Sequence, residues 1–335
     1  MSPPKLFGVD LFGNPLEQKL SVDSVLKTRF LVPPFSVLDT RAGDWQERKR
    51  AWLRTGIKSE VGRGKDGAEF VEHESGKKCI DGLTFRGTGF LAEEMQRRGG
   101  GTSVFDPVLC EVAYRWWCPP GGQVLDPFAG GSVRGIVAAS LGHPYWGCDL
   151  SVRQVAANRE QAGEILGAAY TPTPVWVCGD SAERLVESPW ADFIFTCPPY
   201  GDLEKYSDDP KDLSNMDAGA FLQTYRRIIL RSVKKLRNNS FACFCVGDYR
   251  GKDGRYMDFV SKTIQAFLDC GCCLYNEAIL LNSVGTAAIR ASHQFLSGRK
   301  LCKVHQNVLV FCKGDWKEAA KKIITKEEEK CFSQI

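Results

Sequence analysis

Residues 124–132 read Val-Leu-Asp-Pro-Phe-Ala-Gly-Gly-Ser, and residues 133–141 after them have the composition of a helix. This order predicts a strand, a tight turn and a helix N-terminus. Glycine lets a ligand approach the backbone closely, and such a turn at the carboxyl end of a central strand is where open α/β sheets bind cofactors. The glycines at 130, 131 and 135 do not form the G-x-G-x-x-G dinucleotide pattern. A purely structural turn is the alternative interpretation.

Apolar strand-like runs alternate with helical stretches around this turn. Alternation of this kind implies a mostly parallel sheet with right-handed crossovers. We therefore expect an α/β, Rossmann-like domain with a seven-stranded sheet over residues 102–315, an irregular extension over 1–101 and a charged tail over 316–335. The expected strands are 124–128, 145–150, 175–180, 192–196, 240–246, 272–281 and 307–312, and the expected helices include 107–117, 152–166, 218–236 and 256–268.

Composition narrows the class of protein. The chain has 335 residues, a net charge of +4 and ordinary globular composition. It has no apolar run of about 18 residues, so we expect no membrane span, and residues 1–5 lack a signal-peptide pattern. We expect a cytoplasmic protein whose 14 cysteines are thiols. The C-x-x-C at residues 270–273 has no second pair at zinc spacing, so we expect no metal site.

Three predicted strands end in an acid, at Asp126, Asp149 and Asp180. Carboxyl ends of parallel strands share one edge of a sheet, so these acids should lie along it. An acid about 20 residues past the glycine turn suits a ribose diol. Because Asp149 and Asp180 also precede helical stretches, helix N-caps are the alternative. The three acids together with the turn favour a ligand that carries a nucleoside.

Cys197-Pro198-Pro199-Tyr200 follows the buried strand 192–196. Two prolines make a rigid, extended turn, and an aromatic ring comes directly after it. A fixed carbonyl beside an aromatic face suits a flat amine, because the base stacks on the ring while the carbonyl accepts the amino hydrogens. A proline-rich turn without chemistry is the alternative.

In this order, the segments resemble the DNA amino-methyltransferases that use S-adenosylmethionine (SAM). Residues 126–132 resemble their D-P-F-x-G-S-G cofactor loop, residues 196–200 their D/N/S-P-P-Y/F/W motif, and residues 103–107 the segment that closes over SAM. The resemblance covers about residues 102–315, with residues 303–314 similar to the last strand. Residues 33–39 and 45–49 are similar to DNA methylases encoded by bacteriophages, some of which belong to restriction-modification systems.

The resemblance implies a role for each matched residue. The catalytic motif would be Cys197, Pro198, Pro199 and Tyr200, with Tyr200 stacking on a flipped base and the Pro198 carbonyl accepting from its exocyclic amine. Asp149 would hold the ribose and Asp180, with Ser181, the adenine. The remaining cofactor-binding residues would be Asp126, Pro127, Phe128, Gly130 and Ser132 in the loop, with Phe105 and Asp106 over the methionine part.

Cys197 stands where the family has Asp, Asn or Ser. Sulfur is a weak hydrogen-bond acceptor, so the target stays open between N6 of adenine and N4 of cytosine. Thr196 lies one position early. A cysteine nucleophile, as in carbon-5 methylation, is an alternative, but in those enzymes the cysteine follows a proline and does not precede two.

DNA is the expected partner, no membrane association is expected, and a homodimer is an open alternative. Cations near the expected substrate edge are Arg290, His293, Arg299, Lys300 and Lys303, and residues 45–54 form a basic helix. Such groups contact phosphates without reading sequence. Residues 56–89 are the candidate target-recognition block. The alternatives are an RNA or protein-amide methyltransferase, and a SAM-binding, DNA-binding protein that has lost its activity.

Overall fold

The computed structural model describes residues 30–58, 79–80, 83–84, 105–167, 170–200, 209–251, 253–285 and 287–324. The chain divides into two units, Met1–Phe35 and Ser36–Ile335. The second contains an eight-stranded sheet in the order β1-β9-β10-β8-β7-β4-β5-β6. Its strands are β1 (Val37–Asp39), β4 (Val124–Asp126), β5 (Tyr145–Asp149), β6 (Val175–Cys178), β7 (Ala191–Thr196), β8 (Leu236–Val246), β9 (Cys272–Leu281) and β10 (His305–Lys313). A separate pair, β2 (Cys79–Ile80) and β3 (Leu83–Thr84), is antiparallel.

Strand direction follows the expected pattern. The pairs along β6-β5-β4-β7-β8 are parallel, and so is β1 with β9, whereas β10 is antiparallel to both of its neighbours. β10 is therefore the one strand of this sheet that runs against the others. The carboxyl ends of β4 to β8 thus share one edge with the start of β10.

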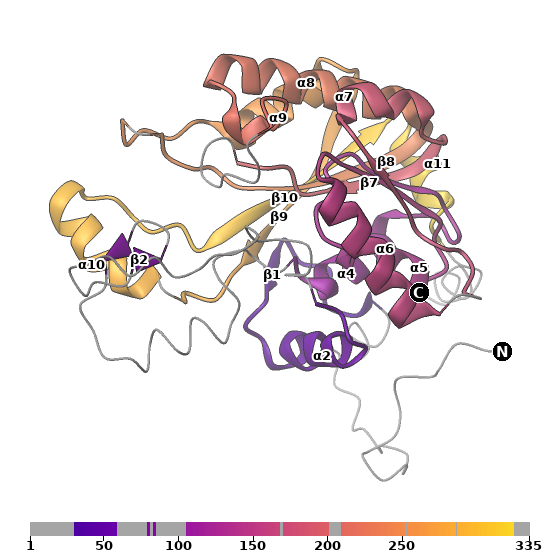
Figure 1. Cartoon of the computed structure of the whole chain (residues 1–335), viewed down its shortest axis with the longest axis horizontal. Helices are drawn as coiled ribbons and strands as arrows, with labels where there is room; N and C mark the ends of the chain where they lie inside the picture. The colour runs from indigo at the N-terminus through magenta and orange to yellow at the C-terminus, as the bar shows by residue number, and fades with distance from the viewer. Residues whose placement is uncertain are drawn as a thin grey trace, which may run out of the picture. The chain divides into compact units, whose positions relative to one another are not determined.

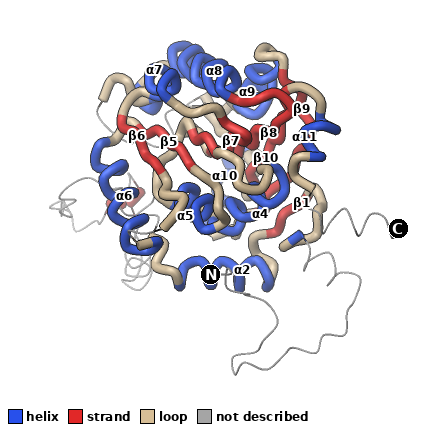
Figure 2. Tube along the Cα trace, turned by 90° about the vertical axis from the view of Figure 1, so that its right-hand side faces the viewer, coloured by secondary structure: helices blue, strands red, loops and turns tan. Residues whose placement is uncertain are grey.

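Helices cover both faces of the sheet (Figures 1 and 2). One layer holds α4 (Pro107–Trp117), α5 (Val133–Ser140) and α6 (Val152–Leu166), and α2 (Gly43–Arg54) packs on α4. The other holds α7 (Ser181–Arg184), α8 (Ala218–Lys235) and α9 (Phe259–Leu268). α10 (Ala287–Gly298) lies between β9 and β10 in the chain, and α11 (Trp316–Lys321) follows β10. Among the described residues, no helix is long and apolar enough to span a bilayer.

The predicted fold class is confirmed: the chain forms an α/β, Rossmann-like domain around a mostly parallel sheet. The sheet has eight strands instead of seven because β1 joins its edge. Leu38 in β1 is buried, and the Thr40 hydroxyl donates to the Leu281 carbonyl at 2.7 Å. Three residues are too short a strand to show a periodicity, so this one was not predicted. The division at residues 101 and 315 stays a prediction, and most of the block 56–89 lies outside the described residues.

A buried carboxylate attaches α2 to the domain. Glu111 of α4 is fully buried and accepts hydrogen bonds from Arg48 and from Trp52 Nε1 at 2.8 Å. Burial would raise the pKa of Glu111, but the hydrogen bond from Arg48 and its positive charge outweigh burial and hold that pKa below its usual value. A buried charge with several donors is stable only while they stay in place, so Glu111 fixes the position of α2.

Two glycines let aromatic side chains pack against the central turn. A Cβ on Gly135 of α5 would lie 2.4 Å from Trp176 Cζ2, and one on Gly147 of β5 would lie 2.7 Å from the Tyr145 hydroxyl. Trp176 and Tyr145 are both buried. The close contact between α5 and the sheet therefore requires glycine at these two positions.

Gly135→Ala should destabilise the protein by about 1–3 kcal/mol, because the new methyl group overlaps the Trp176 ring. Gly163→Ala in α6 is the matched control, since a Cβ there meets no atom within 4 Å. The control should raise stability by about 0.4–1 kcal/mol through lower entropy of the unfolded chain. Urea unfolding of both variants measures the difference. Equal effects of the two substitutions would contradict the packing described here.

Candidate active site

The candidate site lies at the topological switch point of the sheet, where successive strands change from one side of β4 to the other. From β4 the chain adds β5 and then β6 on one side, and it returns to place β7 and β8 on the other. β4 and β7 are therefore neighbours although about 70 residues separate their ends. Ligands of open α/β sheets bind outside the carboxyl ends of strands at such a switch point. The two predicted motifs, residues 126–132 and 197–200, begin there.

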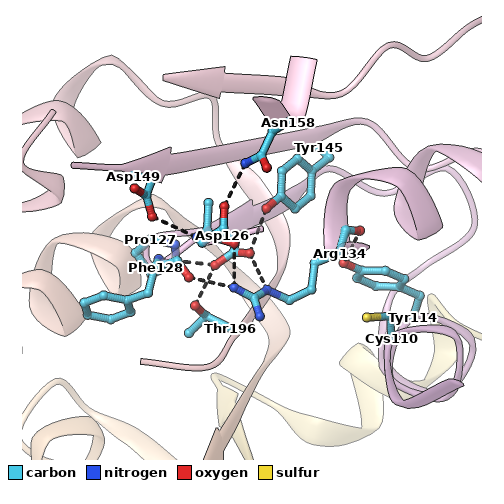
Figure 3. A network of polar contacts seen from close by, with 12 residues as sticks. Cys110, Tyr114, Asp126, Pro127, Phe128, Arg134, Tyr145, Asp149, Asn158 and Thr196 are labelled. Carbon is cyan, nitrogen blue, oxygen red and sulfur yellow. Dashed lines mark hydrogen bonds and ion pairs between the residues drawn. The ribbon is translucent and has the colours of Figure 1, made fainter. Parts of the chain in front are cut away.

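Asp126 is the centre of a buried network at the end of β4 (Figure 3). Its Oδ1 accepts from the Thr196 hydroxyl at 2.6 Å and from the Phe128 amide at 3.2 Å. Its Oδ2 accepts from Arg134 Nε at 2.6 Å and from the Tyr145 hydroxyl at 2.7 Å. A carboxylate has about four acceptor positions, so these bonds saturate it. Asp126 therefore shapes the loop and has no acceptor position left for a ligand.

Arg134, in the first turn of α5, is the buried counter-ion of Asp126. Its Nη2 donates to the carbonyls of Phe128 at 2.6 Å and Ala129 at 2.8 Å, so it also holds the turn. Burial disfavours its charge, but the Asp126 carboxylate outweighs burial and raises the pKa of Arg134 above its usual value. The guanidinium also lies 4.5 Å from the Phe105 ring centroid. One side chain thus connects the loop, the strand end and the segment before α4.

Asp149 at the end of β5 also contacts the glycine turn. Its Oδ2 accepts from the Gly130 amide and its Oδ1 from the Ser151 amide, both at 2.9 Å. Gly130 has a φ of 49°, in the left-handed region that favours glycine. Asn158 of α6 donates to the Gly130 carbonyl at 2.7 Å. The amide and the carbonyl of Gly130 are therefore both held, the first by Asp149 of β5 and the second by Asn158 of α6.

Two serines predicted at the site make internal hydrogen bonds. The Ser132 hydroxyl donates to Gln161 Oε1 at 2.6 Å, and the Ser181 hydroxyl donates to the Pro127 carbonyl at 2.6 Å. Gln161 Nε2 in turn donates to the Lys58 carbonyl at 2.8 Å. Ser181 thereby brings the start of α7 to the loop, and Gln161 links the loop to the segment after α2.

Several polar groups around the loop have no partner in the part of the chain that the structure describes. The amides of Gly131 and Ser132 have no acceptor there, and α5 begins without a side-chain cap. Asp180 caps α7 through Oδ1, which accepts from the Ala182 amide at 2.8 Å, and its Oδ2 has no donor. Free amides at a helix N-terminus attract a carboxylate, and free carboxylate oxygens accept from hydroxyl or amino groups. This donor and acceptor set suits an amino-acid nucleoside.

Phe105 and Asp106, predicted to cover a cofactor, lie directly before α4. The Phe105 ring makes an edge contact with Phe195 of β7, with centroids 5.7 Å apart. Asp106 caps α4 through the Val108 amide and also accepts from Trp45 Nε1 at 3.2 Å and Lys49 Nζ at 3.0 Å. The segment is therefore held from outside by α2. Residues 103 and 104 lie outside the described residues.

The turn of residues 197–200 follows β7 at the same edge. The Tyr200 hydroxyl accepts from Gln306 Nε2 of β10 at 2.6 Å, and its ring contacts Phe259 and Tyr249 with centroids 5.9 and 6.4 Å away. Pro198 is buried, whereas Pro199 is partly exposed. The ring of Tyr200 therefore has a fixed position beside a rigid backbone.

Cys197 pairs with Cys245 of the neighbouring strand β8. The hydrogen bond from the Cys245 thiol lowers the pKa of Cys197, against burial, which would raise it. The same hydrogen bond, together with burial, raises the pKa of Cys245 well above its usual range. Cys197 Sγ also lies 3.9 Å from the Tyr200 hydroxyl. The Thr196 hydroxyl donates to Asp126 and the residue is fully buried, so its oxygen is not exposed to replace an acceptor at position 197.

The structure brings the two predicted motifs together, and it adds residues that the sequence did not single out. These are Arg134, Tyr145, Asn158, Gln161 and Gln306. A basic residue in the first turn of an otherwise apolar helix was the available signal for Arg134. Gln306 gave no signal, because its contact with Tyr200 depends on the antiparallel pairing of β10.

Comparison with known proteins identifies no family: no family model and no curated protein matches the sequence. Solved structures are similar to parts of the chain. TrmN from Thermus thermophilus has a TM-score of 0.43 at 18% identity, over 62% of this chain and 48% of its own. This chain thus matches about half of the length of TrmN.

Two further structures have similar values. A putative RNA methyltransferase from Pyrococcus horikoshii has a TM-score of 0.41 at 15% identity, over 65% of this chain and 88% of its own. The magnesium protoporphyrin IX methyltransferase of Synechocystis, solved with SAM, has a TM-score of 0.41 at 12% identity, over 68% and 92%. This level of similarity does not transfer the ligands or substrates of these proteins to the present chain.

Asp126→Asn should destabilise the protein by about 3–5 kcal/mol, because it leaves the buried Arg134 charge without a counter-ion. Thr196→Val removes one hydrogen bond to the same carboxylate and keeps the charge pair, so it should cost less, about 1.5–3 kcal/mol. Urea unfolding curves give both values. The assigned role of Asp126 is contradicted if the two variants lose the same stability.

Proposed function

We propose that this protein is a SAM-dependent DNA methyltransferase that acts on the exocyclic amine of adenine (N6) or cytosine (N4). One observation carries the proposal: the 2.6 Å hydrogen bond from Thr196 to Asp126 joins the ends of β4 and β7. It brings the loop of residues 126–132, with the free amides of Gly131 and Ser132, next to the Cys-Pro-Pro-Tyr turn. A nucleoside-binding loop and a receptor for a flat amine are the two parts that transfer to a base requires.

The free groups around the loop fit SAM. The amides of Gly131 and Ser132 at the start of α5 would hold its carboxylate. Asp149 and the free Oδ2 of Asp180 would accept from the ribose hydroxyls and the adenine amino group. Phe105 would cover the methionine part. Bound there, SAM supplies an electrophilic methyl group.

The Cys-Pro-Pro-Tyr turn would hold and orient the acceptor base. Tyr200 offers a ring of fixed position for stacking, because Gln306 and Phe259 hold it. The Pro198 carbonyl would accept an amino hydrogen and so direct the nitrogen lone pair. Cys197 Sγ already accepts a hydrogen bond from the Cys245 thiol, so it would be a weak acceptor beside the Pro198 carbonyl. Most of the rate enhancement then comes from positioning two reactants in one site.

DNA is the proposed substrate because residues 33–39 and 45–49 resemble DNA methylases of phages, and because residues 282–304, between β9 and β10, carry four Lys or Arg and no acid. Purified protein with radiolabelled SAM, tested on DNA without methylation and on RNA, should label DNA. Nucleoside mass spectrometry then identifies N6-methyladenine or N4-methylcytosine. Label found in RNA alone would favour the RNA methyltransferase alternative, and SAM binding without transfer to any substrate would favour a loss of activity.

Asp149→Ala and Asp180→Ala should each weaken SAM binding by about 1–3 kcal/mol, the cost of losing a hydrogen bond to a charged group. Asp315→Ala is the matched control for Asp180. Asp315 likewise caps a helix, α11, but it follows β10 and therefore lies at the opposite edge of the sheet. Calorimetry should show unchanged affinity for this control. An unchanged affinity of the Asp149 and Asp180 variants would exclude these acids from the site.

Cys197→Ser should keep or raise the methylation rate, since a hydroxyl is a better acceptor than a thiol. Cys197→Ala should lower it only modestly, because the Pro198 carbonyl remains. A cysteine nucleophile predicts instead that both substitutions abolish turnover. It also predicts a covalent adduct with a 5-fluorocytosine duplex on a denaturing gel, and an adduct of the wild type that Cys197→Ser abolishes would refute transfer to an exocyclic amine.

A further inference from the structure

The segment between β9 and β10 has an unusual charge. Residues 282–304 contain no Asp or Glu, although the whole chain has 40 acidic residues. The same segment contains Arg290, His293, Arg299, Lys300 and Lys303. It includes α10, which lies beyond the ends of β9 and β10 in Figure 1. Such a concentration of one charge marks a surface that meets a polyanion.

α10 and the residues after it form one wall of a pocket of about 180 Å³. The opposite wall is the turn after β8. The side chains that matter for recognition are Tyr249, Arg250, Tyr256, Gln294 and Lys303. Asp248 also lines the pocket, and its Oδ1 accepts from the Val260 amide at 3.2 Å. Gln294 is held in place, since its Oε1 accepts from the Cys302 thiol at 3.0 Å. The pocket thus joins residues that are more than 50 positions apart in the chain.

The turn after β8 presents a flat, charged platform. The guanidinium of Arg250 lies 3.9 Å from the Tyr256 ring centroid, and its Nη1 donates to the Gly254 carbonyl at 3.0 Å. Tyr256 is 41% exposed, so a further ring has access to it. Within the described part of the chain, neither Arg250 nor Lys303 forms an ion pair. A stacked arginine without an acidic partner is a group that binds bases and phosphates.

Lys300 brings the end of α10 to the same turn. A Cβ on Gly254 would lie 2.5 Å from Lys300 Nζ, which places this amine directly against residues 250–256. Arg299 follows the helix with a φ of 51°, so the chain reverses there and returns along the pocket to Lys303. Lys300 and Lys303 consequently both lie close to the Arg250–Tyr256 platform.

The pocket is next to the Cys-Pro-Pro-Tyr turn. Tyr249 lines the pocket, and its ring is also 6.4 Å from that of Tyr200, the residue assigned to the target base. β8 ends at Val246 and runs parallel to β7, so both turns leave the sheet at the same edge. A strand whose base is held at Tyr200 would carry its neighbouring nucleotide past Tyr249.

We propose that this pocket binds the nucleotide adjacent to the methylated base in the DNA strand. Arg250 and Lys303 contact the phosphate, and the base stacks on the Arg250–Tyr256 platform. Lys300 neutralises the next phosphate along the strand. The assignment rests on the proposed function and adds a recognition element, the 282–304 segment, that is separate from the SAM loop.

The test is DNA affinity of the full chain, measured by fluorescence anisotropy with a labelled oligonucleotide. The double variant Lys300→Glu/Lys303→Glu should bind DNA at least ten-fold more weakly near 0.1 M salt. Its plot of log affinity against log salt should lose about 0.9 of slope for each phosphate contact removed. The matched control Lys234→Glu/Lys317→Glu makes the same change of net charge at the opposite edge of the sheet and should stay within about three-fold.

A second variant tests the platform without a change of charge. Tyr256→Ala should weaken DNA binding by about 5- to 150-fold, the range for losing one stacked base, whereas Tyr256→Phe should retain it. SAM affinity should be unchanged in all variants. Two outcomes would refute nucleotide binding by this pocket and leave the proposed function intact. The first is an equal loss of DNA affinity in the two charge-reversal double variants. The second is full DNA affinity of the Lys300/Lys303 and Tyr256→Ala variants when the wild type methylates DNA. A wild type that binds SAM but neither binds nor methylates DNA overturns both.

Discussion

The buried ion pair between Asp126 and Arg134 is the interaction on which the site depends. Both side chains are almost wholly removed from solvent, and their charges stay compatible with burial because they pair with each other and each forms further hydrogen bonds. Arg134 pins the backbone of the turn, and Asp126 pins the end of β7 through Thr196. The pair therefore acts as a rigid joint between two strands and a helix. Because this pair fixes the loop, the amides of Gly131 and Ser132 can stay without an acceptor in the described part of the chain and available to a ligand.

The glycine turn is held from three directions, which explains how a flexible sequence keeps one conformation. Asp149 holds its amide side, Asn158 its carbonyl side, and Ser181 the carbonyl of Pro127. Each of these side chains belongs to a different element, Asp149 to β5, Asn158 to α6 and Ser181 to α7. Hydrogen bonds from distant parts of the chain thus restrict the backbone conformations that the glycines would otherwise allow. A ligand would therefore bind to a preformed site.

The sequence predicted the fold and the two motifs because their signals are local. Asp126, Asp149 and Asp180 each end an apolar run, and an acid at a strand end can be recognised without knowing its neighbours. Arg134 and Gln306 could not be assigned in this way, since their partners are set by packing between elements. That Asp126 has no acceptor position left could not be predicted either. Its hydrogen bonds come from Tyr145 and Thr196, and no sequence spacing connects these residues to Asp126. β1 was missed for a different reason, because a three-residue strand has no periodicity that stands out. α10 was missed although its apolar residues Ala288, Ile289, Phe295 and Leu296 follow helical spacing.

The eighth strand has a consequence for how the protein is made. Thr40, just after β1, bonds to Leu281 at the end of β9, a partner 241 residues later in the chain. At ribosomal rates of about 5–20 residues per second, that partner is synthesised on the order of 10 to 50 s after Thr40. Until then the short strand has no edge to pair with. The edge of the sheet is therefore completed only after a strand made early meets a strand made about 240 residues later.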